Sequence, residues 1–219
     1  MNSSLLSLLV LAGIAVFLIL RLRSVLGTRD GFEKPAAPQV AAKPGPRRDF
    51  EVIEGGPDRD ITDHATDGSD EAKALAAMKM AEPGFSVSEF LEGGRGAYEM
   101  ILMSFENGNI DELRGFLAED VMETFEEVIR QREAQGLRID AKFVGVRELS
   151  LADATFDRDT SEGEISIRFV AELTSVVRNS DGEIVEGDPN EIKRQRDVWT
   201  FARTMGSSDP NWILVATGG

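Results

Sequence analysis

The sequence predicts an α+β domain that follows a transmembrane helix and a flexible linker. Three observations lead to this fold class. An almost unbroken apolar run occupies residues 5–20, apolar side chains recur at spacings of three and four between residues 70 and 136, and the spacing changes to two after Gly136. The longer period indicates helices and the shorter period indicates strands. Helices that precede a set of antiparallel strands are typical of the α+β class.

Residues 1–30 are predicted to form a transmembrane anchor with a basic flank. The sixteen residues 5–20, at about 1.5 Å each, span roughly 24 Å, close to the ~30 Å hydrocarbon layer of a bilayer. The alternative is a cleaved secretory signal. In such a signal the positive charge precedes the apolar run, whereas here the arginines follow it. Because arginines favour the cytoplasmic side, we expect residues 21–219 in the cytosol. The predicted anchor residues are Leu5, Leu8, Leu11, Ile14, Phe17, Leu20, Arg21 and Arg23.

The charge is strongly negative and is concentrated in the predicted domain. The chain of 219 residues has a net charge of −15 and no cysteine. Residues 83–219 hold 27 acids and 14 bases, so nucleic-acid binding through phosphate contacts is not expected. No glycine-rich phosphate loop follows a strand, and no cluster of His, Cys or Asp has metal-ligand spacing. No cofactor and no metal are therefore predicted.

Residues 31–69 are predicted to be a flexible linker. They contain five prolines among scattered charges and few large apolar residues, so little burial would offset the entropy of ordering. His64, the only histidine, lies there and is interpreted as a solvated side chain. Residues 70–82 have strong helix propensity with Ser69 as N-cap. This helix could dock on its own domain, on the membrane or on a partner.

Three further helices and a set of strands are expected in the domain at residues 70–219. Ser86 and Glu89 begin a helix as a capping box, and it ends near Asn107. A short helix carries residues 113–117, and another runs from Asp120 to Gly136. Three glycines within residues 93–96 cost helix stability, which predicts the close approach of another element. Four to six antiparallel strands follow, of which residues 165–177 are expected to be the longest, and they form a curved sheet.

Several short motifs together resemble the Tim-44-like domain. They are Phe90-Leu91-Glu92-Gly93-Gly94-Arg95-Gly96-Ala97-Tyr98, Asn107-Gly108-Asn109, Leu113-Arg114-Gly115-Phe116-Leu117, Gly187-Asp188-Pro189, Asp197-Val198-Trp199-Thr200-Phe201 and Pro210-Asn211-Trp212. The likeness covers about residues 70–219. The family includes the inner-membrane tether of the mitochondrial import motor and bacterial membrane-anchored relatives. The resemblance implies a cone of helices on a curved sheet like that of nuclear transport factor 2, no catalysis, and location at the cell inner membrane.

The resemblance also implies a large apolar pocket and contact with anionic lipid. We expect a non-enzymatic adaptor that takes a lipid tail or an apolar peptide of a membrane-protein client, in membrane protein assembly, quality control or transport. The bilayer and a membrane-protein complex or client are the expected partners, whereas recruitment of the import motor is not transferred. The predicted pocket residues are Phe143, Phe169, Trp199 and Phe201, opposed by Tyr98, Ile101 and Phe105.

Two other functions remain as alternatives. A pocket enzyme of the isomerase or dehydratase type would use Asp197 and Tyr98 as an acid–base pair. That function requires Asp197 to be buried without an arginine partner. A structural scaffold of a membrane complex is the third alternative.

Overall fold

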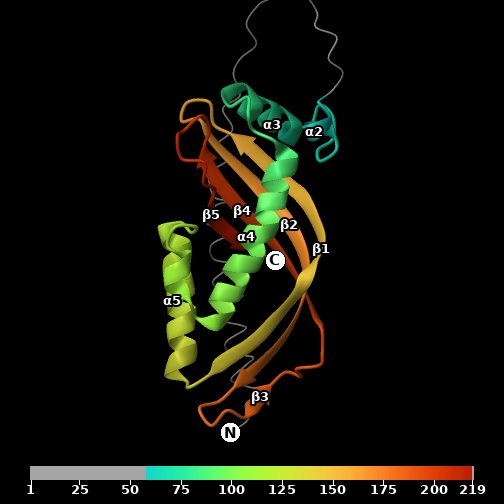
Figure 1. Ribbon diagram of the computed structural model, residues 1–219. Helices are drawn as coiled ribbons and strands as arrows, with labels where there is room; N and C mark the ends of the chain where they lie inside the picture. Colours follow the sequence, from blue (N-terminus) through green and yellow to red (C-terminus); the bar gives the residue numbers. More distant parts are fainter. Residues whose placement is uncertain (1–57, 219) are drawn as a thin grey trace, which may run out of the picture. The chain divides into compact units, whose positions relative to one another are not determined.

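The computed structural model describes residues 58–218, which fall within one compact unit (Figure 1). The predicted anchor at residues 5–20 and most of the predicted linker lie outside these residues. Within residues 58–218, no helix combines the length and the apolar character needed to cross a bilayer.

The helices lie where the sequence predicts them, with one addition. Ser69 caps α3 by accepting from the Ala72 N–H, and Gly108 ends α4 with a left-handed backbone (φ 75°). The predicted short helix is a 3-10 turn, η1, which ends before Phe116. The helical elements are α2 (Arg59–Thr62), α3 (Asp70–Ala81), α4 (Val87–Asn107), η1 (Ile110–Leu113) and α5 (Glu119–Ala134).

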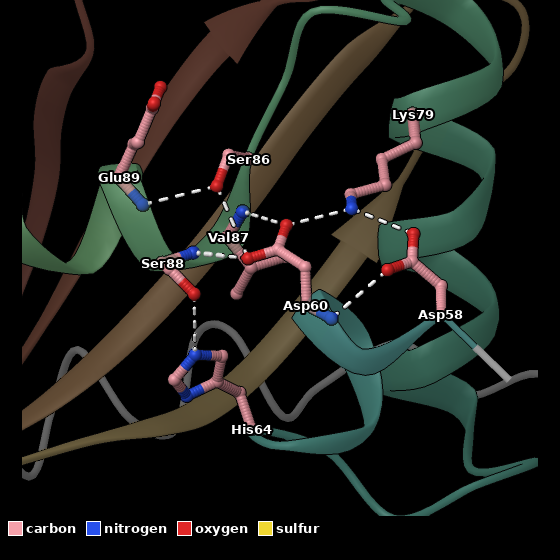
Figure 2. Close-up of polar contacts among 8 residues, drawn as sticks. All are labelled: Asp58, Asp60, His64, Lys79, Ser86, Val87, Ser88 and Glu89. Carbon is pink, nitrogen blue, oxygen red and sulfur yellow. Dashed lines mark hydrogen bonds and ion pairs between the residues drawn. The ribbon is translucent and has the colours of Figure 1, made fainter.

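The prediction that the flexible linker extends to residue 69 is wrong. Residues 58–69 contain α2, and Ile61 is buried in the core of the domain. Asp60 reaches the first turn of α4, where it accepts hydrogen bonds from the Val87 and Ser88 N–H groups (Figure 2). His64 contacts the Ser88 hydroxyl at 3.1 Å. One apolar side chain and one capping carboxylate order this polar stretch, and composition alone does not reveal either role.

The five strands form one antiparallel sheet in the order β1-β2-β4-β5, and β3 pairs with the end of β2. A turn at Asp181-Gly182 connects β2 to β3, with Gly182 at φ 82°. Four helices, α2 to α5, lie on one side of the sheet (Figure 1). The strands are β1 (Arg138–Phe156), β2 (Glu162–Arg178), β3 (Ile184–Glu186), β4 (Lys193–Thr204) and β5 (Ile213–Gly218).

The longest strand is β1, with 19 residues against 17 in β2, and not the predicted run at 165–177. The sequence predicts two short segments in this region, at 139–143 and 152–156. The structure joins them because three register shifts against β2 absorb the residues that break the alternation. Such bulges also bend a strand and increase its twist. The long β1–β2 pair therefore curves past the helices (Figure 1).

The core lies between the inner face of the sheet and the helices α3 and α4. Leu75 and Met78 of α3 are fully buried, so this helix packs on its own domain. Of the three helical glycines, Gly94 lies where a side chain would clash, since a Cβ there would be 2.5 Å from Ile167 Cδ1. The Cβ positions of Gly93 and Gly96 have no neighbour within 4 Å among the described residues. The predicted close approach therefore holds at Gly94 alone.

Candidate ligand-binding site

Most of the predicted pocket wall is packed core. Tyr98 from α4 stacks on Phe169 of β2, with ring centroids 4.3 Å apart, and Trp199 lies 4.6 Å from Tyr98. The ring of Phe143 of β1 packs against the same tyrosine ring, with centroids 6.3 Å apart. Tyr98, Phe169 and Ile101 are almost completely buried. The structure thus brings these predicted residues together, but they fill the space that a ligand would need.

Phe105 and Phe201 lie at opposite ends of this cluster. Phe105 packs against Phe125 of α5 at 4.5 Å, beneath the Arg132 guanidinium. Phe201 packs at 6.2 Å against Phe90, which belongs to the first turn of α4. Of the seven predicted pocket residues, only Phe201 also lines the hollow described next.

A hollow of about 410 Å³ opens beside the first half of α4. Its floor is the α4 surface at Gly93, Gly94 and Ala97, and its far side is the segment that leads into β5. The volume lies within the range of ~300–1,000 Å³ that is usual for small-ligand sites. A second hollow beside α5 has no aromatic lining and carries Glu119, Glu123 and Glu126.

Aromatic rings form much of the first hollow. Trp212 lies 4.5 Å from Phe90 and 5.9 Å from Phe85, measured between ring centroids. Phe116, which is partly exposed, stands at the edge of the hollow. Aromatic and small side chains around a solvent-open hollow offer a surface for an apolar group.

Of the residues that the structure describes, three with charged side chains line the hollow, Glu82, Glu89 and Arg203, and Arg203 is the only cation among them. Only 9% of its side chain is exposed. Its guanidinium pairs with Glu82, donates to the Pro210 carbonyl at 3.1 Å and lies 5.3 Å from the Trp212 ring centre. The buried Nε of Arg203 has no hydrogen-bond partner within residues 58–218. The Gly206 N–H and Arg203 lower the pKa of the Glu82 carboxyl, so Glu82 stays ionised at neutral pH.

Asp60 fixes the rim of the hollow at the start of α4. Its carboxylate accepts from the N–H groups of Val87 (2.8 Å) and Ser88 (2.9 Å), and it pairs with Lys79 at 2.7 Å (Figure 2). Burial opposes ionisation of Asp60, but hydrogen bonds from Lys79, Ser88 and Val87 outweigh it and hold its pKa far below the ordinary value. This cap holds Ser86, which lines the hollow.

The proposed acid–base pair exists as a contact, but away from the hollow. The Tyr98 hydroxyl donates to Asp197 at 2.5 Å. Burial raises the pKa of the Asp197 carboxyl, and burial together with Asp197 raises the pKa of Tyr98. Within the described part of the chain, Asp197 has no arginine or lysine partner. Neither residue lines either hollow.

Comparison with known proteins identifies the family. A family model described as the Tim44-like domain matches residues 71–219. The chain belongs to this family. It is 27% identical over 161 residues to the human mitochondrial import inner membrane translocase subunit TIM44, covering 69% of this chain and 35% of that protein. The mouse protein of the same name is 24% identical over the same length. The chain spans about a third of the length of these curated relatives.

A solved structure, the intermembrane space region of the chloroplast protein ARC6, also matches. It has a TM-score of 0.35 and 13% identity, and the match covers 66% of this chain and 94% of that one.

The aromatic residues of the hollow in this Tim44-like domain were missed at the sequence level, except Phe201. Phe85 lies outside the periodic segments, in the connection before α4, and Trp212, expected to begin the last strand as a core residue, immediately precedes β5. Phe90 follows the helical period and reads as an ordinary core residue. The signal that could have found the site is the pair Gly93 and Ala97, one turn apart on a helix, because small side chains leave space above a helix surface. Among residues 58–218, no group of three or more His, Cys, Asp or Glu is arranged to hold a metal ion.

Proposed function

We propose that this Tim44-like protein is a non-enzymatic binding module, tethered to the cell inner membrane by residues 5–20. The hollow beside α4 takes an apolar group, either a lipid tail or an apolar segment of a membrane-protein client. The named role of the curated relatives in an inner-membrane translocase supports membrane association and a role in protein transport. A fold of the nuclear transport factor 2 type, with the domain on the cytoplasmic side, is part of this proposal.

The aromatic hollow is the observation that carries the proposal. Phe85, Phe90, Phe116 and Trp212 offer an apolar surface next to a helix face kept clear by small residues. Because Glu82 already neutralises Arg203, the wall offers no free cation for an anionic headgroup. The apolar part of a ligand, and not its charge, therefore decides binding.

The proposal is tested with a substitution that introduces a large side chain at the floor of the hollow. Gly93 is helical, and its Cβ position is open, so Gly93→Leu places a side chain inside the hollow. Gly96→Leu is the matched control, since Gly96 is equally open and does not line the hollow. Both changes replace glycine in a helix, so both variants should fold and gain helix propensity.

Binding is measured on the full chain with two probes. These are a dansylated fatty acid and a soluble dansylated peptide of leucine and phenylalanine. We expect Gly93→Leu to weaken binding at least ~10-fold and Gly96→Leu to leave it unchanged. The probe that binds identifies the class of occupant. Absence of binding by both probes, or equal effects of the two variants, would reject the hollow as the binding site.

A pocket enzyme is the second candidate, because Asp197 is half-buried without a cationic partner in the described residues and has a raised pKa. A carboxyl with a raised pKa can act as a general acid. The test compares a metabolite mixture after incubation with the wild-type chain and with Asp197→Asn. Conversion of a metabolite by the wild type alone would establish catalysis, and identical mixtures would leave the binding module.

A further inference from the structure

The outer face of the sheet, away from the helices, carries a set of arginines. Residues along β2 alternate between the two faces, and Phe169 points into the core. Arg168 and Glu172 therefore lie on the outer face. On β4, Arg194 pairs with Glu172 and Arg196 pairs with Val170, which places both arginines on the same face.

A buried carboxylate organises two of these arginines. Glu172 is only 6% exposed, although it faces away from the core. Arg147 of β1 pairs with it at 2.6 Å, and Arg194 of β4 pairs with it at 3.3 Å. The two guanidinium groups are held across three strands with more than half of each side chain exposed. Arg168 and Arg196 are exposed and form no ion pair with any residue from 58 to 218. We call Arg147, Arg168, Arg194 and Arg196 the basic face.

An acidic arm adjoins the basic face. Residues 180–192 connect β2 to β4 through β3, and every one of them is exposed. The arm contains Asp181, Glu183, Glu186, Asp188 and Glu191 and no lysine or arginine. It also exposes three aliphatic side chains, Ile184 (41%), Val185 (53%) and Ile192 (56%). Exposed aliphatic residues gathered in one segment are typical of an interaction surface.

We propose that two copies of the chain form a dimer in which the acidic arm of each copy lies on the basic face of the other. Both halves of such a contact are present on one chain, next to one another. A twofold axis makes each pairing occur twice, so the surface is self-complementary. The aliphatic side chains of the arms become buried between the copies, and the charges set the register.

Two observations favour a second copy over an anionic bilayer as the occupant. The arm would bring five acidic residues towards the lipid headgroups beside the arginines, which opposes binding. A second copy instead brings an acidic arm onto each basic face. The opposite charges then lie closer together than the Debye length of about 8 Å, so salt screens their attraction little. The arm and the outer face of β1, β2 and β4 together provide roughly the 20–30 residues per side of a standard interface.

Charge reversal tests the dimer with the full chain in detergent micelles. Arg168→Glu with Arg196→Glu changes the basic face without touching the Glu172 bridge, and Glu183→Lys with Glu186→Lys changes the arm. Each double variant alone should raise the dimer dissociation constant on the order of 100-fold. An equimolar mixture of the two should regain a dimer, because the reversed charges then match. Circular dichroism confirms that both variants fold.

Cross-linking provides an independent measurement, helped by the absence of cysteine from the chain. Asn190→Cys places a cysteine in the arm. Ser150→Cys places one on the outer face, because Ser150 of β1 is the cross-strand neighbour of Arg168. Mixed chains with different tags should form a disulfide between these positions in membranes. Asn190→Cys mixed with Gln131→Cys, on α5, is the matched control.

The proposal fails if the wild-type chain sediments as a monomer at every concentration. It also fails if charge reversal leaves the dimer unchanged, or if the mixed variants do not recombine. A disulfide between the Asn190→Cys and Ser150→Cys chains that is no more abundant than the control would equally overturn it.

Discussion

Removal of the Asp60 carboxylate should destabilise the domain strongly, although Asp60 precedes the residues matched by the family model. Asp60→Ala leaves the N–H groups of Val87 and Ser88 without their acceptors and removes the ion pair with Lys79. These donors belong to the first turn of α4, where a helix has no backbone partners for its N–H groups. The same turn carries the rim of the proposed binding site.

The magnitude follows from these contacts. Loss of a capping acceptor costs about 0.5–2 kcal/mol. The Asp60–Lys79 pair, with each side chain about one-fifth exposed, contributes up to roughly 1 kcal/mol. We therefore expect the free energy of unfolding to fall by about 1–3 kcal/mol. For a domain of this size that corresponds to a decrease in Tm of roughly 2–12 °C.

The assay is thermal unfolding of the full chain in detergent, followed by circular dichroism. Asp58→Ala is the matched control, because Asp58 pairs with the same lysine and caps the four-residue helix α2 instead of α4. It should cost about 1 kcal/mol or less. If Asp60→Ala is no more destabilising than Asp58→Ala, residues 58–69 are not an integral part of the folded domain and the reasoning is refuted.

Three further predictions follow from the packing and the titrations. Gly94→Ala should lower the free energy of unfolding by about 1 kcal/mol, because the added Cβ meets Ile167. Gly96→Ala should raise it by up to about 1 kcal/mol, because alanine has the higher helix propensity. Urea unfolding of the two variants measures the difference. Asp197, whose pKa is raised, destabilises the fold as pH rises above the ordinary Asp range, so Asp197→Asn should flatten that part of the stability–pH curve. Asp60, whose pKa is lowered, stabilises the fold above pH ~4, and Asp60→Asn should reduce the loss of Tm below that pH.

The helices could be predicted because their signals are local. Ser69 and Ser86 cap the helices that they were predicted to cap, and the apolar period of α4 matches its buried face. Asp60 could not be predicted, since its partners Val87 and Ser88 lie 27 and 28 residues away in the sequence. Local propensity contains no information about such a contact.

The strand pattern identifies the inner face of the sheet but not which part of that face stays uncovered. Phe169, Trp199 and Phe201 alternate correctly, and all three are buried. The position at which α4 crosses the sheet places Tyr98 against Phe169, where its ring fills the space. The hollow remains near Trp212. Helix crossing depends on tertiary contacts such as that between Gly94 and Ile167. Five of the seven predicted wall residues are buried in the core, and of the seven only Phe201 also lines the hollow.

Photo-cross-linking in native membranes tests the occupancy of the hollow most directly. A photoreactive amino acid at Phe116, on the edge of the hollow, is compared with the same amino acid at Met80, which is 84% exposed and does not line the hollow. Mass spectrometry should find a lipid chain or a client peptide attached at position 116 and not at position 80. Gly93→Leu should abolish that adduct. Equal labelling at both positions, or adducts that persist in Gly93→Leu, would contradict the account.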